Sequence, residues 1–423
     1  KCIEHRLYKV VTKANESRYT RSMTTEGTNE EDDNSSLASL STYNPVNEDF
    51  NTHYEDKHFD ALKMNSSLLT NLLVSSSEPL FSVDKWIELG KHIGTNTHLK
   101  YLEIRMDGTD EDDLLRSSET SERFFAGLSS NRSLEKLILQ DFIVGHTQLK
   151  ILKPFFVYND NLVDIFIDSA YDLPQEAASV MTDALRLRKK ESPIKAVSIS
   201  SCGVTDKSVP AITELAMVCP QLQILDLSFN QVKEGGCDAI AAYLQHPKCK
   251  LKKLDLQYNK ISNAGIRIIA GSIQSNSRLK TLRVDGNETG GKETSVDVFA
   301  NLLCDRSSIN ATCASNHTLQ KVTGCDGFPS SKILERLLQV NQMENKIKSA
   351  REKIFMFHLE GEFDLAPFER MDLKVVVEVM GWLGKDCILR QRNMSAFYRL
   401  LRKFPRQCFG GYLEECELRT RKI

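Results

Sequence analysis

The sequence has no apolar run of about 18 residues or more, the length that a membrane-spanning helix requires. It has no excess of one charge either, because 55 Lys and Arg residues stand against 57 Asp and Glu residues and leave a formal net charge of −2. A dedicated nucleic-acid-binding protein usually carries a strong basic excess. These absences predict a protein without a membrane span that does not bind nucleic acid.

Enzyme signatures are absent as well. No His-Glu-x-x-His, Gly-x-Ser-x-Gly or protein-kinase motif occurs in the chain. Residues 286–293 come near to the phosphate-binding pattern Gly-x-x-x-x-Gly-Lys-Ser/Thr, but Glu293 stands at the hydroxyl position, where a carboxylate would repel phosphate. We therefore expect a non-enzymatic protein without a cofactor, a metal ion or a small-molecule substrate.

The eleven cysteines form no Cys-x-x-Cys pair and no Cys/His spacing of a zinc site. Scattered single cysteines are typical of reduced, mostly buried thiols, and they predict a cytoplasmic protein. The chain begins at Lys1 without an initiator Met, and we expect the natural N-terminus to lie further upstream. Secretion stays open, because Asn-x-Ser/Thr sites occur at Asn15, Asn34, Asn65, Asn131, Asn287, Asn310, Asn316 and Asn393.

The N-terminal stretch is polar and acidic. Residues 26–60 contain ten Asp or Glu residues and a single basic residue, Lys57, with Ser, Thr and Asn in most of the gaps. Such a segment buries too little apolar surface to offset the entropy lost on ordering. Residues 1–58 are therefore predicted to be a disordered, solvated acidic segment.

An internal repeat determines the predicted fold. The pattern Leu-x-x-Leu-x-Leu-x-x-Asn occurs at residues 222–230 and 251–259, and with Val at the third apolar position at 279–287. Residues 194–202 fit it with Cys202 in place of Asn, weaker copies begin at Leu69, Leu99, Leu134 and Leu162, and a degraded ninth copy begins at Leu319. Between copies the apolar residues change to helical spacing. Each repeat is therefore predicted to be a short strand, a turn and a helix.

These motifs resemble the leucine-rich repeat family, in particular its ribonuclease-inhibitor-like class, over residues 62–326 with eight or nine repeats. The resemblance implies an α/β solenoid, a right-handed β-α horseshoe with a parallel inner sheet. The ninth-position residues Asn230, Asn259, Asn287 and Cys202 are expected to satisfy backbone groups of the neighbouring turns. Members of this class mostly act as binding modules, among them inhibitors, GTPase activators and immune sensors.

Residues 327–423 depart from the repeat. Helical stripes are predicted at Ile333, Leu337, Leu338, Val340 and Ile347, at residues 373–383, and at residues 396–401. We expect an α-helical cap over the last repeat, because solenoids need atypical end units. The end of the chain is predicted to be a basic tail, since residues 388–423 hold nine basic and three acidic residues.

The inner face of the sheet is the candidate binding surface. Successive side chains of a strand alternate in direction, so the third, fifth and seventh positions of each repeat point away from the core, in rows about 5 Å apart. These rows combine aromatic and apolar residues with charge, a combination that protein interfaces use. The predicted partner-binding residues are Tyr101, Glu103, Arg105, Lys136, Ile138, Asp164, Phe166, Asp168, Ile224, Asp226, Lys253, Asp255, Arg283 and Asp285.

Three functions are compatible with this pattern. The first is a protein–protein interaction module that binds a protein partner on the concave face, where Asp164, Asp168, Asp226, Asp255 and Asp285 are expected to form an acidic patch. The second is a regulator of a small GTPase, similar to the Ran GTPase-activating proteins, acting through strand-to-helix loops near Lys233 and Arg267. The third is an extracellular receptor or sensor subunit.

Overall fold

The computed structural model describes residues 56–75, 82–105, 118–141, 146–168, 175–288, 295–324, 331–343 and 346–359. The predicted acidic segment lies outside these ranges except for its last residues, because helix α3 begins at Asp56. The predicted helices after residue 359 and the basic tail also lie outside them.

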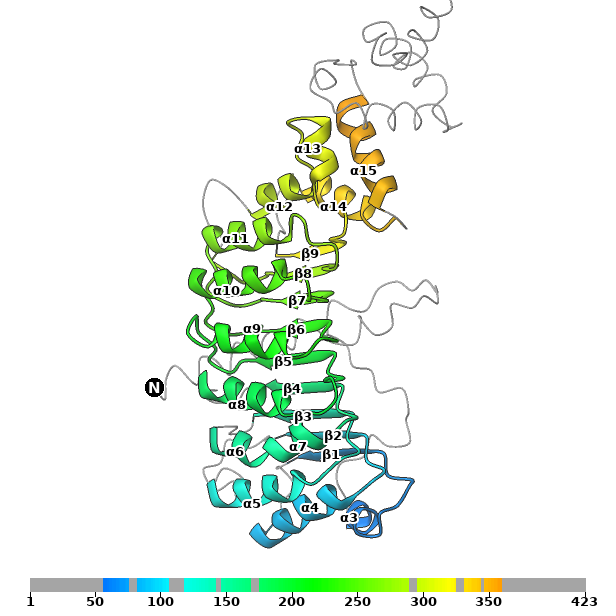
Figure 1. Cartoon of the computed structure of the whole chain (residues 1–423), viewed down its shortest axis with the longest axis vertical. Coiled ribbons are helices and arrows are strands. Elements are labelled where there is room, and N and C mark those ends of the chain that lie inside the picture. The colour runs from blue at the N-terminus through cyan, green and yellow to red at the C-terminus, as the bar shows by residue number, and fades with distance from the viewer. Residues whose placement is uncertain are drawn as a thin grey trace, which may run out of the picture. The chain divides into compact units, whose positions relative to one another are not determined.

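Strands and helices alternate along the described repeats (Figure 1). The strands are β1 (Asn71–Ser75), β2 (Tyr101–Arg105), β3 (Lys136–Gln140), β4 (Asp164–Asp168), β5 (Ala196–Ser200), β6 (Ile224–Asp226), β7 (Lys253–Asp255), β8 (Thr281–Arg283) and β9 (Lys321–Thr323). The helices are α3 (Asp56–Lys63), α4 (Val83–Thr95), α5 (Ser118–Leu128), α6 (His146–Ile151), α7 (Lys153–Tyr158), α8 (Gln175–Arg186), α9 (Val209–Met217), α10 (Glu234–Gln245), α11 (Asn263–Ile273), α12 (Ser295–Leu303), α13 (Ile309–Ala314), α14 (Ser331–Val340) and α15 (Lys346–Ile354), with a π-helical turn, η2 (Phe355–Leu359).

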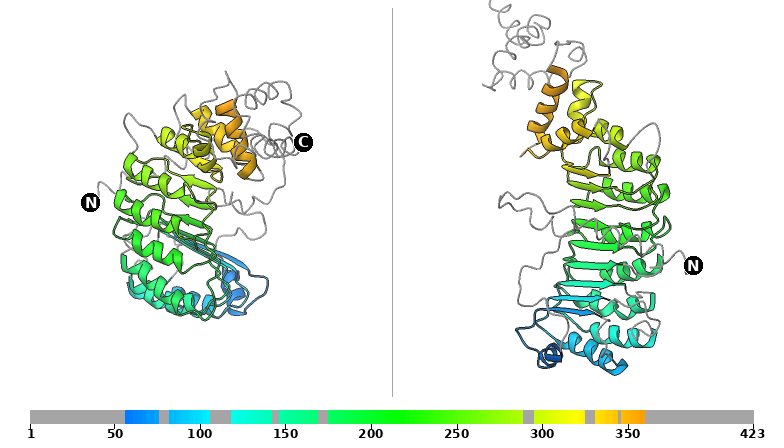
Figure 2. Two further views of the ribbon diagram at one scale, coloured as in Figure 1. Left: turned by 45° about the horizontal axis from the view of Figure 1, so that its top comes forward. Right: turned by 180° about the vertical axis from the view of Figure 1, so that it is seen from behind.

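The nine strands form one parallel sheet in chain order, so all nine predicted repeats are present, including the weak copies. Helices cover one side of this sheet (Figure 2). A helix is about 10 Å across, whereas neighbouring strands are about 4.8 Å apart. The sheet therefore lines the inner side of the stacked repeats, which confirms the predicted solenoid.

The core lies between the sheet and the helices. The first, fourth and sixth positions of each repeat point into it: Leu222, Leu225 and Leu227 are each 1 % exposed or less. The weak copy at Leu134 is buried in the same way. Removing this apolar surface from water is the main stabilising contribution of each repeat.

The ninth-position asparagines form a strand-end ladder, defined as Asn230, Asn259 and Asn287. Asn230 accepts from the backbone N–H groups of Cys202 and Val204 at 3.0 and 2.9 Å. Its amide nitrogen donates to Ile199 O at 2.8 Å and Leu227 O at 3.0 Å. Because one side chain bonds two consecutive repeats, the predicted structural role of these asparagines is confirmed.

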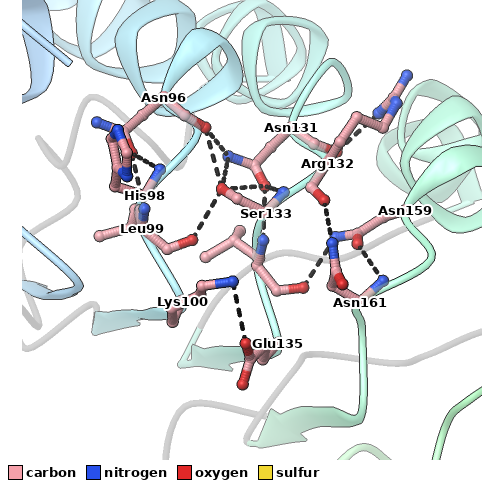
Figure 3. Close-up of polar contacts among 11 residues, drawn as sticks. Asn96, His98, Leu99, Lys100, Asn131, Arg132, Ser133, Glu135, Asn159 and Asn161 are labelled. Carbon is pink, nitrogen blue, oxygen red and sulfur yellow. Dashed lines mark hydrogen bonds and ion pairs between the residues drawn. The ribbon is translucent and has the colours of Figure 1, made fainter. Parts of the chain in front are cut away.

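A second ladder lies at the opposite edge, where the strands begin. This strand-start ladder, which the sequence analysis missed, consists of Asn96, Asn131, Asn159, Asn276, Asn316 and Asn341. Figure 3 shows its first members with the residues around them. The fully buried Asn131 donates to Ile93 O at 2.7 Å and Asn96 O at 3.1 Å, and accepts from Ser133 N and Leu134 N at 2.9 Å.

The last repeat is covered by α14, α15 and η2, which form the described part of the predicted cap (Figure 1). Leu334, Leu337 and Leu338 join the core of the repeats. The predicted stripe was wrong at two positions, because Ile333 is 40 % and Ile347 is 64 % exposed. Ile347 lies on α15 rather than on α14, so the stripe crosses a helix boundary that its spacing does not reveal.

A buried lysine of the cap forms hydrogen bonds with the last repeat. The Lys353 ammonium is fully buried and lies 2.7 Å from Leu303 O, 2.9 Å from Asn316 O and 3.1 Å from His317 Nδ1. Burial lowers the pKa of Lys353 to about 7 and the pKa of His317 to about 4. His317 is therefore neutral at pH 7 and can accept from Lys353.

We expect Asn131→Ala to lower the free energy of unfolding by about 2–3 kcal/mol, because it leaves several buried backbone groups without partners. Urea unfolding followed by circular dichroism measures this loss. The control is Asn161→Ala on the turn of the next repeat, an exposed residue whose amide donates to Arg132 O, and it should cost about 1 kcal/mol or less. Equal losses for the two variants would contradict a ladder that holds the turns.

The lowered pKa of Lys353 predicts how stability varies with pH. Between about pH 7 and pH 10 the unfolded chain holds a proton on this lysine that the folded state releases, so the free energy of unfolding rises with pH. We expect this lysine to contribute a rise of about 1–2 kcal/mol from pH 7 to pH 8.5, measured as the difference between wild type and Lys353→Met, because the thiols of the unfolded chain begin to titrate in the same range. Lys353→Met should abolish this rise, and Lys332→Met, at an exposed position of α14, should keep it. Identical pH profiles for wild type and Lys353→Met would show that this lysine is not the source.

Candidate partner-binding surface

The predicted binding residues line the open face of the sheet in regular rows. Tyr101, Lys136 and Asp164 are adjacent in the third-position row, and Glu103, Ile138 and Phe166 are adjacent in the fifth-position row. The rows continue across the later strands, where Asp226 pairs with Asp255 and Asp255 with Arg283. The backbone register therefore brings the predicted residues together as two neighbourhoods of one surface.

The first neighbourhood is an aromatic patch, defined as Tyr101, Lys136, Ile138, Asp164 and Phe166. All five side chains are partly exposed on strands β2, β3 and β4. The Lys136 ammonium lies 4.6 Å from the ring centroid of Phe166 and 5.7 Å from that of Tyr101. Burial lowers the pKa of Lys136, while the negative charges of Asp164 and Glu103 oppose that effect. The patch thus presents two aromatic rings held around one cation.

Glu103 fixes one side of this patch. Its carboxylate is 6 % exposed and accepts from the hydroxyl of Tyr101 and from Nε of Arg105. Arg105 itself is exposed. Glu103 is therefore placed to orient its two neighbours rather than to contact a partner itself.

The second neighbourhood is a charged network, defined as Lys253, Asp255 and Arg283. Asp255 is only 2 % exposed, and its carboxylate lies 3.0 Å from Arg283 Nη1 and 3.8 Å from Lys253 Nζ. Burial, and next the neighbouring charge of Asp226, raise the pKa of Asp255. The two cations oppose this effect and compensate the buried charge.

The predicted acidic patch is not continuous. The negative charge of Asp255 is compensated by the two cations of the charged network. The Asp285 carboxylate accepts from the Gln257 amide and the Thr323 hydroxyl. Asp226 accepts from the backbone of Ser228 at 2.9 Å. Asp164 lies beside Lys136 in the aromatic patch. Basic residues occupy the same rows as the acidic ones, which is why the surface alternates in charge.

Two aromatic residues at the edge of this face were missed by the sequence analysis. Phe229 and Tyr258 stack with ring centroids 4.4 Å apart and planes 14° from parallel. Both have positive φ, 56° and 50°, as does Gly286 at the equivalent position of the next repeat. A Cβ on Gly286 would lie 2.4 Å from the Tyr258 ring, so only glycine leaves room for it. The signal was an aromatic residue directly before the repeat asparagine in two successive repeats.

The loops considered for GTPase regulation differ in placement. Lys233 is exposed and directly precedes α10, on a strand-to-helix loop. Arg267 lies inside helix α11, so the sequence analysis was wrong to place it near such a loop. Helix α11 begins at Asn263, because Ser262 caps it by accepting from Ala264 N.

Several potential glycosylation sites have a structural role, because their side chains form hydrogen bonds within the repeats. Asn131 and Asn316 are buried and belong to the strand-start ladder, and Asn287 belongs to the strand-end ladder. A glycan on any of these amide nitrogens would remove hydrogen bonds that hold the turns. The six cysteines in the described ranges are free thiols, and five of them are buried.

The described residues contain no group of three or more His, Cys, Asp or Glu side chains that could hold a metal ion. In the same part of the chain, no helix is long and apolar enough to cross a membrane. The phosphate-loop-like stretch is described only up to Glu288, and within it Asn287 serves as a repeat asparagine.

Comparison with known proteins agrees with this geometry. The family model "Leucine Rich repeat" matches residues 218–241 and 248–270. The chain is 32% identical to mouse ribonuclease inhibitor over 109 residues, which is 26% of this chain and 23% of that protein. It is 24% identical over 226 residues to human NACHT, LRR and PYD domains-containing protein 14, covering 53% of this chain and 20% of that protein.

A further relative is the Arabidopsis thaliana RAN GTPase-activating protein 2, which is 28% identical over 119 residues, or 28% of this chain and 22% of that protein. The chain spans about a fifth to a quarter of the length of these curated relatives. Together, the parallel sheet, the repeat register and these matches show leucine-rich repeats that are similar to those of the ribonuclease-inhibitor-like class.

Proposed function

We propose that the chain is a non-enzymatic interaction module that binds a protein partner through the aromatic patch. The observation that carries this proposal is the partial exposure of Tyr101, Ile138 and Phe166 on adjacent strands. Binding energy at protein interfaces concentrates in aromatic side chains that become fully desolvated in the complex. The surrounding charges of Lys136 and Asp164 suit the polar rim of such an interface.

The other predicted residues take different roles in this proposal. Ile224, Asp226, Asp168, Arg105 and Asp285 lie at accessible or partly accessible positions, where they can extend the contact. Glu103, Lys253 and Asp255 are buried, so they act by orienting their neighbours. The free thiols of the described cysteines suit a cytoplasmic location, where they would stay reduced.

A second candidate function is regulation of a small GTPase. The match to RAN GTPase-activating protein 2 favours it, together with the exposed position of Lys233 at the start of α10. A cation on such a loop could stabilise the charge that develops on a transferred phosphate group. The match covers only part of both proteins, so this candidate ranks second.

The leading proposal is tested by photo-cross-linking. A photoreactive phenylalanine analogue is placed at Ile138, inside the aromatic patch, and in a second variant at Leu187, which is 60 % exposed and follows helix α8. In cell lysate we expect a discrete cross-linked partner from position 138 only. Phe166→Ala in the same background should reduce this adduct about tenfold or more, because a desolvated aromatic anchor is worth about 1–2 kcal/mol or more. An adduct that is unchanged by Phe166→Ala would rule out the aromatic patch as the binding site.

The second candidate is separated from the first by measuring phosphate release from a panel of small GTPases. As an interaction module, the chain should leave the rate of GTP hydrolysis unchanged. Acceleration that is lost in Lys233→Ala but kept in Lys91→Ala, an exposed position on α4, would instead establish the GTPase regulator.

A further inference from the structure

In the turns that lead into the last three strands, all the charged residues are Lys or Arg. Residues 246–253, 275–281 and 315–321 contain seven Lys or Arg residues and no Asp or Glu. Near the opposite ends of the strands and in the loops that follow lie acidic residues such as Asp226, Glu234 and Asp285. The later repeats are therefore basic where their strands begin, whereas charges of both signs, including Lys233, Lys260 and Arg283, lie where the strands end.

These turns surround a hollow of about 230 Å³ at the side of the sheet where strands β6 to β9 begin. Its lining combines four cations with hydroxyl and amide groups: Gln223, Lys250, Lys252, Ser277, Arg278, Lys280 and Thr318. The hollow is smaller than the roughly 300–1,000 Å³ that an organic ligand occupies. Its size instead suits the anionic end of a side chain.

The backbone fixes the cations beside one another. Lys252 N donates to Gln223 O at 2.7 Å, and Lys280 N donates to Lys252 O at 2.8 Å. The strand-start ladder holds the next residues, because Asn276 accepts from Arg278 N at 2.8 Å and Asn316 accepts from Thr318 N at 2.9 Å. The positions of the lining residues are therefore set before any ligand arrives.

The four cations have no internal counter-charge. Within the described part of the chain, no ion pair includes Lys250, Lys252, Arg278 or Lys280. A further cation is nearby, since the charge of Arg278 adds to burial in lowering the pKa of Lys346. Like charges on neighbouring strands are destabilising. The repulsion would be relieved by an anion, and none of the described residues supplies one there.

We infer that this basic hollow docks an anionic side chain of a protein partner, either a phosphorylated Ser or Thr or a run of carboxylates. Arg278 offers a planar fork of donors, Lys252 and Lys280 offer point charges, and the Ser277 and Thr318 hydroxyls can complete the contacts to oxygen atoms. An extended polyanion is disfavoured, because the net charge is −2 and acidic residues such as Asp226 and Asp285 lie near the ends of strands in the same repeats. The inference rests on the proposed function in that the partner is a protein, but it uses a separate surface.

The test measures fluorescence anisotropy of two labelled probes with the full chain: an octaglutamate peptide and an otherwise neutral peptide with one phosphoserine. We expect at least one probe to bind, and its affinity to fall about tenfold or more in the double variant Lys252→Glu/Lys280→Glu. The matched control is Lys91→Glu/Lys207→Glu, which makes the same charge change at exposed positions outside the hollow and should change the affinity by less than about twofold. Circular dichroism verifies that both variants fold, and the stronger probe identifies the source of the anion.

Three outcomes overturn the inference: neither peptide binds, the two double variants bind equally well, or a 20-nucleotide DNA or phosphatidylserine vesicles bind more tightly than both peptides. Phe166→Ala separates this inference from the proposed function, because that residue lies in the aromatic patch. If Phe166→Ala leaves the cross-linked adduct intact while Lys252→Glu/Lys280→Glu loses the peptide, the proposed patch fails and the basic hollow stands. If the adduct depends on Phe166 and no peptide binds, the reverse holds.

Discussion

The turns at the two ends of the strands impose the constraint on which the rest of the structure depends. Each strand is flanked by turns whose peptide N–H and C=O groups no neighbouring strand covers, and buried groups of this kind are costly without partners. The strand-end and strand-start ladders satisfy them with asparagine, whose amide offers donors and acceptors at one site. Because these amides, except that of Asn96, each bond two successive units of the stack, the repeats depend on their neighbours to reach the folded form.

The strand-start ladder also supports the proposed binding surface on strands β2 to β4. The strand-start asparagines Asn96, Asn131 and Asn159 bond the turns before β2, β3 and β4, so the side chains that follow stand in rows set by the backbone register. The aromatic patch occupies two such rows, and all five of its residues lie on strands. A surface held this way avoids much of the entropic cost that association otherwise carries.

The repeat register was predictable because it depends on a local pattern of leucines that nine copies share. The strand-end ladder was predictable for the same reason, whereas the strand-start ladder was missed although Asn-x-x-Leu recurs at residues 96–99, 131–134 and 276–279. Burial of individual charges depends on neighbours about 28 residues away. Asp255 was therefore expected in an accessible acidic patch, but Arg283 and Lys253 enclose it.

The position of the two surfaces bears on how a partner could be oriented. Phe166 on β4 and Lys252 beside β7 are three strands apart, or about 15 Å along the sheet. A single protein domain is about 25 Å across or more, so it can reach both. Contact with an apolar centre gives affinity without fixing direction, while a charged group at one edge of the sheet distinguishes one orientation from its reverse. In the proposed binding mode, apolar contact on the sheet face and positive charge where the strands begin would thus make a regular stack of repeats bind its partner in one orientation.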